Sequence, residues 1–155
     1  PTEKGYRTFV DSIYKEEKKR EVKQEEQDEV ILLKSLISHI TSASPSVATL
    51  HYHDLFWKEG WEDALLAPEF EEPEILRSFT RFLSDLEERI KDYVVGNEVY
   101  VYIGSENPFS DISDFSVVAV QYEFPSDERG VIALLGPTRM PYQKNIRVLQ
   151  SIFNL

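Results

Sequence analysis

The chain has 155 residues, a formal net charge of −11 at pH 7 and no cysteine. This length suits a single domain with a sizeable core, and the lack of cysteine excludes disulfides, thiolate nucleophiles and cysteine-ligated metals. The excess of acidic residues disfavours direct binding to DNA, which is a polyanion. No apolar run is long enough to cross a bilayer and no signal-peptide pattern opens the sequence. We therefore expect a cytoplasmic protein without a membrane partner.

The N-terminal residues predict two helical stretches of different character. Residues 1–14 form an amphipathic opening helix, whose apolar face comprises Tyr6, Phe9, Val10 and Ile13. Residues 15–29 are almost entirely charged but rich in good helix formers, which favours a solvated helix or connector over a partner-binding helix. The only tight basic cluster is Lys18-Lys19-Arg20, which glutamates flank on both sides. Residues 1–29 are therefore predicted to be an N-terminal helical linker.

From Val30 onwards the pattern is that of a folded domain, predicted over residues 30–155. An amphipathic helix comes first, with apolar residues spaced by three and four positions. These residues are Val30, Leu33, Leu36, Ile37 and Ile40. Residues 46–53 alternate and are rich in β-formers, which predicts a strand with His51 and His53 on one face. We expect stacked or solvent-facing histidines there, with a metal-binding pair as the alternative.

The middle of the domain is predicted to be helical. Residues 55–66 contain Trp57 and Trp61, of which at least one is expected in the core. The alternative is that the two tryptophans form a ligand cage or a partner contact. A long helix is predicted from Glu74, and it ends near Gly96, where a left-handed residue is needed.

Three further strands are predicted at residues 98–103, 115–124 and 130–135. A turn-rich connection joins the last two, so they are expected to be antiparallel. Gly136-Pro137 ends the final strand, and Thr138 is then a candidate N-cap for a terminal helix. The element order predicts an α+β fold, in which helices flank an antiparallel sheet.

The sequence offers few residues for chemistry. It carries no nucleophile elbow, P-loop, dinucleotide fingerprint or His-Glu-x-x-His motif, so no enzyme, catalytic residue, cofactor or metal site is predicted. The loop at residues 104–108 could cradle a phosphate, but a turn that closes the preceding strand accounts for it equally. Arg139 is placed at the start of the terminal helix, where the helix dipole disfavours a cation. We expect it to form an internal ion pair with Glu106 or Asp114, with an anionic ligand or a neighbouring subunit as the alternative.

Four segments carry a further signal. The three clearest are Leu66-Ala67-Pro68-Glu69-Phe70, Val101-Tyr102-Ile103-Gly104-Ser105-Glu106-Asn107, and Gly136-Pro137-Thr138-Arg139-Met140-Pro141-Tyr142. In order and spacing they resemble the Pro-Glu-Phe, Ile-Gly-x-Glu-Asn and C-terminal motifs of HrcA, the family of bacterial heat-inducible transcription repressors. Residues 114–119 match a fourth motif loosely, with Phe115 in place of its usual cysteine. The resemblance covers residues 55–155 and residues 1–11.

The resemblance implies a GAF-like regulatory domain, in which the motif residues have structural or regulatory roles. It also implies a homodimeric repressor of chaperone operons, whose active form a GroEL-type chaperonin maintains. Such a repressor reads operator DNA through an N-terminal winged helix, which would precede Pro1. Two departures from the family are the lack of its inserted dimerisation domain before residue 55 and the replacement of an aspartate by Pro141. The alternatives are a stand-alone GAF-like small-molecule sensor and a protein-binding module.

Overall fold

A computed structural model of the chain describes residues 2–19, 24–124 and 127–154. The chain divides into two units, Pro1–Ile31 and Leu32–Leu155. The first unit contains helix α1 (Glu3–Lys19) and the beginning of helix α2 (Gln24–Ala43). The predicted linker at residues 15–29 and its basic cluster fall partly on residues 20–23, which lie outside the described residues.

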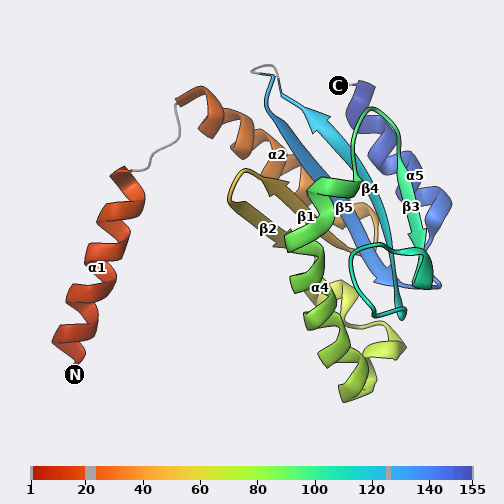
Figure 1. The fold of residues 1–155 in the computed structure, drawn as a ribbon, viewed down its shortest axis with the longest axis horizontal. Coiled ribbons are helices and arrows are strands. Elements are labelled where there is room, and N and C mark those ends of the chain that lie inside the picture. The colour runs from red at the N-terminus through yellow and green to blue at the C-terminus, as the bar shows by residue number, and fades with distance from the viewer. Residues whose placement is uncertain (1, 20–23, 125–126, 155) are drawn as a thin grey trace. The chain divides into compact units, whose positions relative to one another are not determined.

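The second unit is built on a five-stranded sheet in which all neighbouring strands are antiparallel (Figure 1). The strands are β1 (Val47–Tyr52), β2 (Leu55–Glu59), β3 (Tyr100–Ile103), β4 (Phe115–Glu123) and β5 (Arg129–Pro137). Their order across the sheet is β2-β1-β5-β4-β3, so the last strand of the chain lies in the centre. The fold is α+β, as the sequence predicts.

Strand β2 corrects the prediction that residues 55–66 are only helical. It forms a hairpin with β1 through the turn at residues 53–54, where His53 has a φ of 51°. Histidine is among the residues that tolerate this left-handed conformation best. His53 is therefore exposed in the turn and does not share a strand face with His51. His51 is buried, and its ring centroid lies 5.7 Å from that of Phe56.

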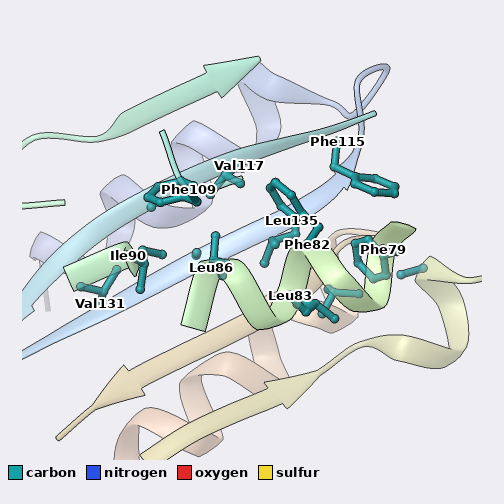
Figure 2. Packing of buried hydrophobic residues seen from close by; sticks show 14 of the residues in the cluster. Phe79, Phe82, Leu83, Leu86, Ile90, Phe109, Phe115, Val117, Val131 and Leu135 are labelled. Atoms are coloured by element: carbon teal, nitrogen blue, oxygen red, sulfur yellow. The ribbon is translucent and has the colours of Figure 1, made fainter. Parts of the chain in front are cut away.

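Helix α4 (Pro73–Tyr93) covers one face of the sheet, and aromatic and aliphatic side chains fill the space between them (Figure 2). The buried cluster includes Phe79, Phe82, Leu83, Leu86, Ile90, Phe109, Phe115, Val117, Val131 and Leu135. The ring of Phe115, at the start of β4, contacts several of the other rings, with centroids 4.9 Å from Phe79 and 5.4 Å from Phe82. Phenylalanine rings therefore pack against one another within an otherwise mainly aliphatic core, in tilted, edge-on and stacked geometries.

The opposite face of the sheet is covered by helix α5 (Tyr142–Gln150) and the C-terminal half of α2 (Figure 1). Helix α5 contacts β4, and Leu33, Ile37 and Ile40 of α2 are buried. Among the described residues, no helix is long and apolar enough to cross a membrane.

Short helical turns complete the unit, and a glycine precedes the first of them. The turns are α3 (Trp61–Ala64), η1 (Pro68–Glu71), η2 (Gly104–Glu106) and η3 (Ser151–Asn154). Gly60, which precedes α3, has a φ of 88°, and a Cβ there would lie 2.6 Å from the carbonyl oxygen of Ser46. Only glycine permits this conformation and this close approach to the start of β1.

The two tryptophans differ in their surroundings. Trp61 is half-buried, and its ring lies edge-on to Phe79 with a centroid distance of 5.6 Å. Trp57 lies on the edge strand β2, where Lys34 Nζ is 4.1 Å from its ring centroid. One tryptophan thus packs against the core, and the other covers the rim of the sheet.

The terminal helix begins later than the sequence predicts. Helix α5 starts at Tyr142, and Thr138 is not its cap, because residues 138–140 form a turn in which Met140 N donates to Pro137 O at 3.0 Å. Arg139 lies in this turn. The argument from the helix dipole therefore does not apply to it.

Candidate functional site

All four motif segments meet at the end of the sheet where β5 stops, the fourth through Phe115 and Ser116 at the start of β4, which pair with β5. The segment before α4, the loop after β3 and the turn before α5 lie there together. We call this place the junction and define it by Glu69, Gly104, Asn107, Arg139 and Tyr142. Its contacts join segments that are far apart in the sequence.

The first contact is an ion pair between Arg139 and Glu69. Arg139 donates from Nε to one carboxylate oxygen of Glu69 and from Nη2 to the other, the second bond being 3.1 Å long. The hydrogen bond from Arg139 lowers the pKa of the Glu69 carboxyl and raises the pKa of the guanidinium. The prediction that Arg139 pairs with Glu106 or Asp114 is therefore wrong. Glu106 instead accepts a 3.0 Å hydrogen bond from Ile103 N, and no ion pair joins Arg139 to Asp114.

The second contact runs through Ser116, which lies in the loosely matched fourth motif at residues 114–119. Its hydroxyl is fully buried and accepts a 3.3 Å hydrogen bond from Gly104 N. The same oxygen lies 2.9 Å from the hydroxyl of Tyr142, which is also hydrogen-bonded to the carbonyl of Thr138. Ser116 on β4 therefore connects the loop after β3 to the turn and helix that close the chain.

Asn107 organises the loop after β3. Its Nδ2 donates to the carbonyls of Gly104 at 2.8 Å and Ile112 at 2.9 Å. Its Oδ1 accepts from the amides of Phe109 at 3.0 Å and Ser110 at 2.9 Å. All hydrogen-bonding positions of this buried amide are thus filled. The amides of Phe109 and Ser110 thus bind Asn107, and the amide of Gly104 binds Ser116, so these three amides are not free to cradle a phosphate.

The other motif residues shape the backbone or fill the core. Phe70 is buried in the cluster beneath α4, whereas Pro68 is exposed at the start of η1. Gly136 and Pro137 are the last two residues of β5 and pair with β4, and Met140 is buried behind them. The family motifs therefore describe a structural closure of the sheet.

A second polar cluster was not predicted from the sequence. Asn145 of α5 accepts a 2.6 Å hydrogen bond from Ser44 Oγ, and its Nδ2 lies 3.2 Å from Ser46 Oγ and 3.5 Å from Met140 Sδ. All of these residues are buried. The signal that could have revealed it is the position of Asn145 one helical turn before Leu149, on the face that packs on the sheet.

The histidines do not form a metal site. His53 lies 3.5 Å from Glu128, in the turn region, while His51 is buried on β1. Within the residues that the structure describes, no group of three or more His, Cys, Asp or Glu side chains could hold a metal ion.

Sequence comparison places these motifs in a family. A family model described as "HrcA protein C terminal domain" matches residues 7–146. The chain belongs to the HrcA family. The heat-inducible transcription repressor HrcA of Clostridium acetobutylicum is 36% identical over 98 residues, which are 62% of this chain and 28% of that protein. The HrcA of Thermodesulfovibrio yellowstonii is 31% identical over 126 residues, which are 79% of this chain and 36% of that protein.

The chain thus spans about a third of the length of these HrcA relatives. Their names describe a transcription repressor, and HrcA is not an enzyme family. A solved structure described as a hypothetical protein at 2.2 Å resolution superposes with a TM-score of 0.52, covering 64% of this chain and 31% of that chain. Its sequence is 22% identical, so this likeness concerns the fold alone.

Proposed function

We propose that this chain is the regulatory domain of a homodimeric heat-inducible repressor that controls chaperone operons in the bacterial cytoplasm. The observation that carries the proposal is the junction. The segments that resemble HrcA are the same segments that fasten the last strand and helix to the rest of the sheet. A working regulator would then depend on the contacts that hold β5 and α5 to the rest of this domain.

In this proposal the domain does not read DNA itself. Its net charge of −11 repels phosphates, whereas a DNA-binding surface concentrates Lys and Arg. A winged helix in the longer protein would read the operator, and residues 1–29 would link it to this domain. A small-molecule sensor is disfavoured, because phenylalanines fill the space between α4 and the sheet.

A role for a GroEL-type chaperonin fits the long sequence separation of the closing contacts. Arg139 and Glu69 are 70 positions apart, and Asn145 and Ser44 are 101 positions apart. Contacts between such distant residues form slowly and leave apolar surface exposed meanwhile. A chaperonin that binds incompletely folded chains would therefore raise the fraction of active repressor.

The proposal is tested by operator binding. Fluorescence anisotropy would measure binding of an inverted-repeat duplex from a chaperone promoter to this chain and to the longer gene product with its winged helix. We expect sequence-specific binding by the longer protein only, with a larger active fraction after incubation with chaperonin and ATP. Specific binding by this chain alone, or none by the longer protein, would contradict the proposal.

A further inference from the structure

Three neighbouring depressions lie in the surface, and two of them reach residues of the junction. The first has a volume of about 370 Å³ and lies beside Gly60; the second, of about 280 Å³, lies between Leu66 and Met140. The third, of about 320 Å³, lies between Ile75 and Asp114. Asp63 lines both the first and the second, and Arg139 lines both the second and the third. Neighbouring depressions therefore share lining residues, and we call the three together the groove.

The middle of this groove is apolar. Its walls include Ala67, Pro68, Pro137 and Met140. Leu66 stands beside them with 78% of its surface exposed, the largest exposure among the large hydrophobic residues of this unit that the structure describes. An exposed leucine above an apolar depression is a suitable contact for an apolar side chain of another molecule.

The rest of the groove is acidic. The carboxylates that line it belong to Glu59, Glu62, Asp63, Glu69 and Asp114. The cation among the lining residues is Arg139, which is already paired with Glu69. Between residues 59 and 76 the sequence has seven acidic residues and neither lysine nor arginine. This potential repels nucleic acids and anionic membranes and attracts lysine and arginine side chains.

We propose that the groove binds an extended basic peptide segment of a partner protein. An apolar side chain of the peptide lies against Leu66 in the middle depression. Lysine or arginine side chains on either side of it pair with Glu62 and Asp63 at one end and with Asp114 at the other. Charge complementarity selects the partner class, and the apolar centre provides the contact area. This inference goes beyond the regulatory role and stands independently of operator binding.

A positional-scanning octapeptide library, probed with the whole 155-residue chain, tests the proposal. We expect selection of Leu, Ile or Met at one position and of Lys or Arg at flanking positions. The selected peptide is then labelled, and its affinity is measured by fluorescence anisotropy. Leu66→Ser and Asp63→Lys should each weaken binding at least tenfold. Leu66 and Asp63 are both exposed, so the melting temperature of each variant should remain close to that of the wild type.

The matched control is Glu98→Lys, which makes the same charge change as Asp63→Lys. Glu98 is exposed and precedes β3 at the end of the sheet remote from the junction, so this variant should bind within twofold of the wild type. Selection of acidic peptides, or no selection at all, overturns the proposal. Equal competition by spermidine and by the selected peptide also overturns it, because only charge would then matter. If Asp63→Lys instead dissociates a dimer in sedimentation experiments, the groove's occupant is a second copy, and the proposal is wrong.

Discussion

Arg139 and Glu69, which are 70 positions apart in the sequence, form a bidentate ion pair. The pair joins the turn after β5 to the segment that leads into α4. It therefore ties the central strand of the sheet to the layer that covers one face. Both side chains are partly exposed, at 60% and 33%, so water and salt screen their attraction.

Arg139→Ala should lower the melting temperature only slightly, and the difference should shrink at high salt. Because the pKa of Glu69 is lowered in the folded state, the stabilisation is present above its ordinary value of 4.5 and is lost as pH falls through the folded pKa. Thermal melts of wild type and variant at neutral and strongly acidic pH measure this. The control is Arg77→Ala, an exposed arginine on α4. A difference that persists in strong acid would show that packing, rather than charge, stabilises the turn.

Asn107→Ala should have a much larger effect. It removes the four side-chain hydrogen bonds of the buried amide that organises the loop after β3, which we expect to cost about 3 kcal/mol of unfolding free energy. Urea denaturation measures it, with the exposed Asn97→Ala as control. Equal midpoints for the two variants would exclude the organising role of Asn107.

Gly60→Ala and Gly96→Ala separate steric overlap from backbone strain. Both glycines have positive φ, but a Cβ at Gly60 would overlap Ser46 O, whereas a Cβ at Gly96 meets nothing within 4 Å. Gly96→Ala should cost about 1 kcal/mol, and Gly60→Ala at least about 2 kcal/mol more, because β1 or α3 must shift. The difference between the two denaturation midpoints is the measurement. Similar costs would mean that strand β1 yields without penalty.

Thr49→Val should stabilise the chain. The hydroxyl of Thr49 is buried on β1 and has no hydrogen-bond partner among the residues that the structure describes. Valine keeps the shape and removes the unpaired oxygen, so we expect a gain of about 1 kcal/mol. Denaturant titration checks the sign, with Thr80→Val on the exposed face of α4 as comparison. A loss of stability would show that the Thr49 hydroxyl has a bound partner in solution.

His51 should make stability depend on pH. Burial, and then the charge of Lys91, lower its pKa, while Glu87 and Asp54 oppose this. The unfolded chain therefore takes up a proton more readily, so stability falls as pH drops from the ordinary value of 6.5 towards the lower folded pKa. Urea midpoints over this range should vary less in His51→Gln than in the wild type or in His39→Gln. An unchanged pH profile in His51→Gln would exclude this role.

The parts of the fold that depend on local patterns could be predicted from the sequence. The helical spacing of Phe79, Phe82 and Leu86 identified α4, and the unbroken apolar run from Val131 to Leu135 identified β5. Strand β2 was missed because Gly60 resembled a helix break. The sequence signal for a hairpin between β1 and β2 was the pair His53-Asp54, which suits a tight turn.

The partners at the junction could not be predicted, for a different reason. Arg139 had an expected partner of the correct charge, but nothing local distinguishes Glu69 from Glu106 or Asp114. The choice depends on how η1 and the turn before α5 meet in space. Ser116 was likewise hidden, because a serine within an apolar strand gives no sign of which loops it will bind.

The central position of β5 in the sheet has a consequence for folding during synthesis. A chain that is still on the ribosome and ends before residue 129 has a β1–β2 hairpin and a β3–β4 hairpin, but lacks the strand that pairs with both. Each hairpin then presents an open edge, which favours misassembly with other chains. A premature stop codon that removes β5 would therefore split the sheet into two separate strand pairs instead of shortening it.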